Sequence, residues 1–153
     1  KKEMSQKQSE PFWEGRPSPP FNSHLGFKVE EWKDGYVEIS AEVKPEYCNI
    51  SGLPHGGFIS TLLDAATAFA GVFPKDPTKI RKAFTLSLNI NFLGQAKTPL
   101  LKAVGKVTSQ GSSIFYSSAK VYDSEQTLLA SAQGVFRYRS GSEPVKAVKS
   151  ERR

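Results

Sequence analysis

The stretch from residue 49 to residue 64, NISGLPHGGFISTLLD, places a glycine-rich turn before a helix that carries one carboxylate, Asp64. The start of a helix gathers unpaired backbone N–H groups and the positive end of the helix dipole, so it stabilises negative charge that develops during a reaction. Asp64 lies two turns inside that helix, where it could serve the same small site as a base or a nucleophile. This combination indicates acyl chemistry that needs neither a metal ion nor a cofactor.

A helix from about residue 57 to residue 73 must position that carboxylate. At about 100° per residue, its apolar side chains share one broad face, made of Phe58, Ile59, Leu62, Leu63, Ala66, Phe69, Ala70 and Phe73. The opposite face is small and weakly polar, and it carries Gly57, Ser60, Thr61, Asp64, Thr67, Ala68 and Gly71. A face in contact with solvent normally carries Lys and Glu, so this one is suited to approaching another surface closely.

Strand patterns surround the helix on both sides. Two strands are expected between residues 27 and 43, joined by the hairpin turn Lys33-Asp34-Gly35. Four more follow at about residues 84–93, 100–109, 113–123 and 127–138, separated by turn signals. Two strands, one long helix and four strands predict an α+β domain, in which a curved antiparallel sheet of about six strands wraps around its helix.

Composition divides the chain into one domain with two polar ends. Residues 1–20 are polar and interrupted by proline, and they predict a flexible N-terminal arm that Phe12 and Trp13 could pin to the body or to a neighbouring subunit. Residues 21–139 form the folded domain, and residues 140–153 are expected to be a disordered basic tail. No internal repeats occur.

The composition also excludes several classes of protein. No apolar run approaches the roughly 20 residues of a membrane span, and the N-terminal residues lack the apolar core of a signal peptide. One cysteine excludes an internal disulfide, and with only two histidines the chain cannot build a Cys/His zinc site, so no metal is expected. We therefore expect a cytoplasmic protein.

The glycine turn and its surroundings resemble a known family. The order of elements is similar to the hotdog fold, and residues 45–64 resemble the motif of acyl-CoA thioesterases of the phenylacetic-acid-degradation type. That motif has an Asn, a Gly-x-x-His-Gly-Gly turn and an Asp seven residues past the last glycine. Its positions here are Asn49, Gly52, His55, Gly56, Gly57 and Asp64. The resemblance covers about residues 20–139, and Pro54 is its one slightly unusual filler.

The resemblance implies roles for individual residues in the hydrolysis of an acyl-CoA thioester. The backbone N–H of Gly56 would polarise the carbonyl, and Asp64, contributed by the other subunit of a dimer, would act as general base or as nucleophile. Asn49 would position the water or the carbonyl. Thr85 is the candidate for an assisting hydroxyl, and His55 is included with the catalytic set. Substrate contacts are expected from Gly57, Ser87 and Thr61.

The same resemblance implies partners and assembly. The substrate would be an acyl-CoA, no separate cofactor is required, and the chain would form a homodimer, or a homotetramer made of two dimers, with each active site at a subunit interface. The net charge of +6 would suit the phosphates of coenzyme A. It does not predict nucleic-acid binding, because the body has no basic run interleaved with aromatic residues.

Other interpretations stay open at this stage. Asp64 could be a solvated residue on the outer helix face, His55 could orient the loop, and Asn49 could be an ordinary turn residue. A hotdog hydratase or dehydratase would pair a His with an acid, although the expected His patterns are missing. A non-catalytic acyl-CoA sensor is the remaining alternative, although such a protein should lack the carboxylate or carry a DNA-binding segment.

Overall fold

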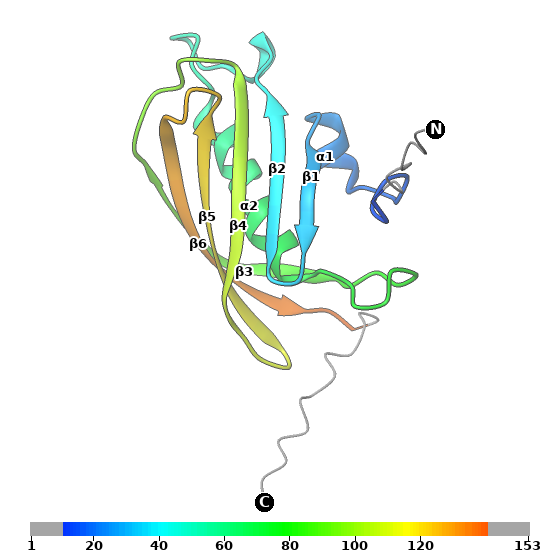
Figure 1. Ribbon diagram of the computed structural model, residues 1–153. Coiled ribbons are helices and arrows are strands. Elements are labelled where there is room, and N and C mark those ends of the chain that lie inside the picture. Colours follow the sequence, from blue (N-terminus) through cyan, green and yellow to red (C-terminus); the bar gives the residue numbers. More distant parts are fainter. Residues whose placement is uncertain (1–10, 141–153) are drawn as a thin grey trace, which may run out of the picture.

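The computed structural model describes residues 11–140, in which one curved antiparallel sheet wraps around one long helix (Figure 1). The strands, β1 (Lys28–Lys33), β2 (Tyr36–Glu42), β3 (Ala83–Phe92), β4 (Leu100–Gln110), β5 (Ile114–Asp123) and β6 (Leu128–Tyr138), lie in the order β1-β2-β4-β5-β6-β3. The helix α2 (Gly56–Gly71) lies against the concave face of the sheet. The α+β hotdog fold predicted from the sequence is confirmed. Two short helices that the sequence pattern did not predict, α1 (Pro20–His24) and η1 (Pro45–Tyr47), complete the fold.

The core lies between α2 and the inward-facing residues of the sheet. Phe58, Ile59, Leu62 and Leu63 of the helix are buried, as the apolar face predicted. On the sheet, alternate residues supply the other half of the core, including Val37, Ile39, Ala41, Leu101, Ala103, Ala119, Val121 and Ala132. Many of these sheet residues are small, so the helix backbone packs close to the strands.

Two residues of the small, weakly polar helix face pack against the sheet of the same chain. Thr67 is completely buried, and its hydroxyl donates a hydrogen bond to the carbonyl of Leu63 at 2.7 Å. Gly71 is also buried, because the ring of Phe115 occupies the space that a side chain would need. The sheet curls far enough that β5 and β6 cover this flank of the helix, which a flat sheet would leave open.

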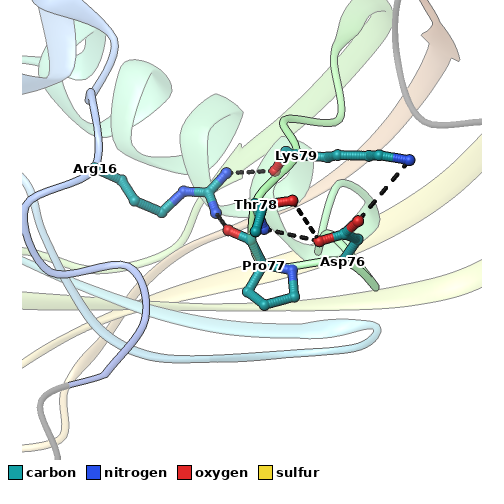
Figure 2. Close-up of polar contacts among 5 residues, drawn as sticks. All are labelled: Arg16, Asp76, Pro77, Thr78 and Lys79. Carbon is teal, nitrogen blue, oxygen red and sulfur yellow. Dashed lines mark hydrogen bonds and ion pairs between the residues drawn. The ribbon is translucent and has the colours of Figure 1, made fainter.

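The described part of the N-terminal segment packs onto the domain. The ring of Phe12 stacks on Trp32 with 5.8 Å between centroids, and Trp13 Nε1 donates to the carbonyl of Val29 at 3.3 Å. Arg16 donates to two carbonyls, those of Pro77 and Lys79, in the loop between α2 and β3 (Figure 2). Residues 1–10 and 141–153, which include most of the predicted tail, lie outside the described residues. The domain boundaries at residues 20 and 139 stay predictions.

Asp123 organises the turn between β5 and β6. Its Oδ1 accepts hydrogen bonds from the N–H groups of Glu125 at 3.0 Å and Thr127 at 2.9 Å, and its Oδ2 accepts one from Lys97 at 2.8 Å. Burial of the carboxyl by itself would raise its pKa. The N–H donors outweigh that effect, so the pKa of Asp123 lies below its usual value.

We expect Asp123 to stabilise the fold above its unfolded pKa of about 4 and to lose this contribution as the pH falls through the lower folded pKa. Asp123→Asn should be less stable than the wild type at pH 7, because the amide has one acceptor oxygen in place of two, so that its N–H₂ group faces an N–H donor such as that of Lys97. It should also lose less stability between about pH 5 and pH 2. Thermal melting across this range tests both points, with exposed Glu125→Gln as the control. Parallel pH profiles for Asp123→Asn and the wild type would contradict the prediction.

Candidate active site

Asn49 closes the turn that leads into the helix. Its side-chain oxygen accepts hydrogen bonds from the N–H groups of Ser51 at 3.0 Å and Leu53 at 3.1 Å. Its backbone N–H donates to the carbonyl of Leu53 at 2.8 Å, and Gly52 has a φ of +75°, which favours glycine. Asn49 is exposed, and its side-chain N–H₂ group donates to no other atom within residues 11–140. The side chain therefore shapes the loop with its oxygen and leaves its nitrogen for a ligand.

His55 caps α2. Its Nδ1 accepts a hydrogen bond from the N–H of Gly57 at 2.8 Å, so that nitrogen carries no proton and Gly57 N–H is occupied. The backbone N–H of His55 donates to Tyr47 at 2.8 Å, which anchors the residue to the preceding loop. His55 thus orients the start of the helix, and the N–H of Gly57 holds its imidazole ring in place. Of the imidazole nitrogens, Nε2 is the one left to contact a substrate.

Gly56 presents the N–H group that the sequence singled out. This N–H donates to no acceptor among the described residues, and it lies at the first position of α2, where the dipole of the helix is positive. A Cβ on Gly56 would lie 3.5 Å from the ring of Phe92, so an aromatic wall borders this donor. Phe92 is the last residue of β3 and is 56% exposed. Its position near the end of an exposed strand became visible in the structure.

Asp64 and Thr85 form a hydrogen-bonded pair between α2 and β3. The hydroxyl of Thr85 donates to Asp64 Oδ1 at 2.7 Å. Asp64 is half-buried, and Thr85 stands on the outermost strand of the sheet. The structure therefore brings together a carboxylate and a hydroxyl that lie 21 positions apart in the sequence.

The other two predicted substrate contacts are placed differently. Thr61 lies one turn before Asp64 on α2, and its hydroxyl donates to the carbonyl of Gly57 at 2.8 Å. Ser87 follows an irregularity in the pairing of β3 and β6 and makes no recorded hydrogen bond to the pair. Its neighbour Leu88 packs against the core, so strand alternation directs Ser87 to the outer face. Thr85 is thus the hydroxyl that meets Asp64.

Gly56 and Asp64 are separated along the helix. They lie eight residues apart in α2, which corresponds to about 12 Å at 1.5 Å per residue. One chain therefore cannot place its own Gly56 N–H and its own Asp64 on the same carbonyl group. A second copy of the helix, running in the opposite direction, would bring its Asp64 to this Gly56.

The edge strand β3 connects the two halves of the site. It pairs with β6 on one side only, and it exposes a series of large apolar side chains, including Phe84 (45% exposed), Leu86 (49%) and Phe92 (56%). Phe92 borders Gly56, and Thr85 binds Asp64. An unpaired strand edge with apolar side chains is a template for pairing with another chain.

Within residues 11–140, no three His, Cys, Asp or Glu side chains come together in a way that could hold a metal ion. None of the helices described in this range is long and apolar enough to span a membrane.

The sequence pattern that defines the thioesterase superfamily matches residues 51–130, which is more than half of the chain. A relative from Pseudomonas aeruginosa, provisionally named an esterase, is 31% identical over 99 residues. The match covers 64% of this chain and 72% of the relative's length. The chain belongs to the thioesterase superfamily. A second provisionally named esterase, from Sulfurisphaera tokodaii, is 27% identical over 112 residues, covering 73% of this chain and 81% of its own.

Solved structures of this superfamily share the fold. The PaaI protein from the phenylacetic acid degradation operon of Escherichia coli superimposes with a TM-score of 0.71 at 21% identity, over 81% of this chain and 87% of its own. A protein from Streptococcus pneumoniae that is named a hypothetical thioesterase and was solved with coenzyme A superimposes with a TM-score of 0.65 at 22% identity, over 76% of this chain and 87% of its own length. The activity of the superfamily, hydrolysis of thioesters, is therefore the general chemistry to expect from the site.

Proposed function

We propose that this thioesterase hydrolyses acyl-CoA thioesters at a site built from two copies of the chain. The observation that carries the proposal is the unpaired N–H of Gly56 at the start of α2, combined with a Thr85-bound carboxylate on the same helix. The positive net charge and the coenzyme A bound by the pneumococcal protein of the same fold support coenzyme A as the thiol.

In this mechanism the thioester carbonyl oxygen accepts a hydrogen bond from Gly56 N–H, which stabilises the negative charge that forms on that oxygen. Asp64 of the second copy removes a proton from water, whose oxygen attacks the carbonyl carbon. The C–S bond then breaks, and the thiolate of coenzyme A takes a proton. Alternatively, Asp64 attacks the carbonyl carbon directly and water hydrolyses the resulting anhydride. No separate cofactor takes part in either route.

The remaining site residues position these groups. The Thr85 hydroxyl holds Asp64 Oδ1, which fixes the carboxylate and leaves Oδ2 for the water or the carbonyl carbon. The side-chain N–H₂ of Asn49 lies in the loop before Gly56 and would orient the water or the thioester. His55 keeps the turn in shape by accepting from Gly57, so its contribution is mainly to the position of the Gly56 N–H.

Two other functions of the hotdog fold receive less support. A hydratase or dehydratase needs a His and an acid at one carbon atom, whereas His55 uses Nδ1 to cap the helix. A non-catalytic acyl-CoA sensor does not need the hydrogen bond between Asp64 and Thr85. The proposed hydrolysis uses both the helix cap made by His55 and the hydrogen bond between Asp64 and Thr85.

The experiment that tests the proposal follows release of free thiol from phenylacetyl-, benzoyl-, hexanoyl- and palmitoyl-CoA, with wild type and Asp64→Asn assayed in parallel. Release that depends on Asp64 supports an acyl-CoA thioesterase and ranks the acyl groups. Phenylacetyl-CoA as the best substrate would add the specificity of the phenylacetic-acid-degradation type. Binding of all four thioesters without any thiol release would favour the sensor.

The two-copy site predicts that the wild type is a dimer or larger at micromolar concentration. Leu86→Lys should dissociate the assembly, because it places a charge on the exposed edge of β3. Activity should fall in proportion to the fraction of protein that becomes monomeric. Leu100→Lys is the matched control, since Leu100 is equally exposed (55%) but starts β4 instead. Light scattering together with thiol release measures both effects, and a fully active wild-type monomer would refute the two-copy site.

A further inference from the structure

A cavity of about 460 Å³ lies between the N-terminal segment, β1, the second half of α2 and the loop before β3. Its volume is in the range of small-ligand pockets. Most of its wall is apolar, and Trp13, Trp32, Phe69, Val72 and Ile80 contribute large side chains. The hydrogen bonds from Arg16 to the loop at residues 77–79 hold one side of the cavity in place (Figure 2).

The charged residues that line this cavity are all positive. They are Arg16, Arg81, Lys82 and Arg139, and no Asp or Glu is among the lining residues. Arg139 and Lys82 lie next to each other, because the backbone N–H of Arg139 donates to the carbonyl of Lys82 at 2.9 Å. An apolar pocket whose charged residues are all positive favours a ligand that is apolar along most of its length and carries a negative charge.

Arg81 gives the strongest indication of such a ligand. It is only 6% exposed, and within the described residues its Nε and Nη2 have no hydrogen-bond partner. Its guanidinium lies 3.9 Å from the centre of the Tyr138 ring, which holds the group flat but offers no acceptor in the guanidinium plane. A buried cation without an acceptor is costly, and a carboxylate that approaches the guanidinium from the cavity would supply the missing negative partner.

The cavity is bordered by the two elements that carry Asp64 and Thr85, α2 and β3. Ala68, which lines it, lies one turn after Asp64 on α2, and Ala83, which also lines it, lies two residues before Thr85 on β3. Val72, at the far part of the wall, is eight residues past Asp64, or about 12 Å along the helix axis. A group attached to a carbonyl at Asp64 would therefore extend along the apolar wall towards Arg81.

We propose that the acyl group of the substrate ends in a carboxylate, which enters this cavity and binds the guanidinium of Arg81. The inference rests on the proposed acyl-CoA hydrolysis and specifies its substrate class: a medium-chain dicarboxylic acid, held as the thioester of one of its two carboxyl groups. The methylene chain contacts the apolar wall, and the free carboxylate pairs with Arg81, while Arg139 adds positive charge at the exposed end.

The test compares acyl groups of equal length that differ only at the distal end: suberoyl-CoA against octanoyl-CoA, and adipoyl-CoA against hexanoyl-CoA. Wild-type kcat/KM should favour one of the dicarboxylic members by at least about tenfold. Arg81→Gln should lower kcat/KM for that member by roughly 10²-fold, the scale of losing one partner of a buried charge pair, mainly through KM. The monocarboxylic thioesters should change by less than about threefold.

Three further variants keep the test interpretable. Arg81→Lys retains the charge without the bidentate geometry and should recover part of the preference. Arg139→Gln is an exposed change that should weaken only the dicarboxylic substrates, even where Arg81→Gln is poorly folded. Lys106→Gln removes an exposed charge from β4, outside the cavity, and should change nothing. Thermal melting checks the folding of each variant.

The outcomes separate this inference from the proposed function. Asp64-dependent hydrolysis with no preference for dicarboxylic acyl groups overturns the inference alone. Equal losses for octanoyl- and suberoyl-CoA in Arg81→Gln would assign the cavity to a phosphate of coenzyme A, and would also overturn it. If no thioester is hydrolysed, the proposed function fails, and calorimetric binding of the same pairs decides the inference. Suberoyl-CoA binding that is unaffected by Arg81→Gln would then refute it.

Discussion

Replacing Asp64 by asparagine should lower kcat for thioester hydrolysis by at least about 10²-fold, the usual scale for losing a positioned acid–base group. Asparagine has nearly the same shape and still accepts a hydrogen bond from Thr85, so the fold and the substrate KM should change little. The amide can neither take a proton from water nor attack the carbonyl. Thiol release under substrate saturation measures this loss.

The matched control is Asp34→Asn, an identical substitution in the exposed turn between β1 and β2. It should keep the activity of the wild type. Unchanged turnover in a folded Asp64→Asn protein would refute the assigned role. A single turnover in ¹⁸O-labelled water with the wild type then separates the two mechanisms, because only the nucleophilic route, through hydrolysis of the anhydride at the aspartyl carbon, transfers ¹⁸O to the side chain of Asp64.

The positions of the strands and of α2 along the chain could be predicted from the sequence because each signal was local, whereas the order of the strands in the sheet was not predicted. Alternation along β2 and the broad apolar face of the helix each follow from one period, and turn residues such as Asp34 and Gly35 mark the ends. Thr85 was named as the candidate assisting hydroxyl through a family resemblance, and its hydrogen bond to Asp64 became visible only in the structure. Nothing local to residue 85 distinguishes it from Ser87, and the irregularity in β3 that separates their directions arises from pairing with β6.

Other features depend on how distant segments meet, and the sequence gives no local sign of them. Thr67 looks like a residue of the weakly polar face, yet the curl of β5 and β6 buries it. Arg81 reads as part of an ordinary basic pair before a strand, and only the packing of the N-terminal segment and Tyr138 around it isolates its guanidinium. The adjacent positive charges Arg81 and Lys82, in a loop that leads directly into an active-site strand, are the one signal that could have drawn attention to it.

The distance between Gly56 and Asp64 shows the same dependence. Their spacing in the sequence only groups both residues near one small site, and the family resemblance alone implies that Asp64 comes from the other subunit. The rise of an α-helix fixes their separation at about 12 Å, so the proposed use of both residues on one carbonyl group takes them from two copies of the chain. The exposed apolar edge of β3 offers the surface on which that copy would pair.

The close approach of α2 to the sheet makes Gly105 the position where one methyl group should be most damaging. A Cβ on Gly105 of β4 would lie 2.2 Å from the carbonyl oxygen of Ala66 and 2.8 Å from its carbonyl carbon. These are backbone atoms in the middle of α2, so no side-chain rotation relieves the clash and the helix must move. We expect Gly105→Ala to destabilise the fold by at least about 3 kcal/mol and to lower Tm by about 10 °C.

The displacement should also lower activity in the molecules that remain folded. Asp64 lies two residues before Ala66, so a helix pushed away from β4 shifts the carboxylate relative to Thr85 on β3, and small misplacements of catalytic groups cost large factors in rate. Thiol release measured well below Tm separates this effect from unfolding. Gly111→Ala, whose Cβ would lie 3.3 Å from the carbonyl oxygen of Ile114 at the exposed turn between β4 and β5, is the control and should lose much less Tm than Gly105→Ala and keep the rate. A Gly105→Ala protein with wild-type stability would show that the helix does not rest on the sheet as closely as described.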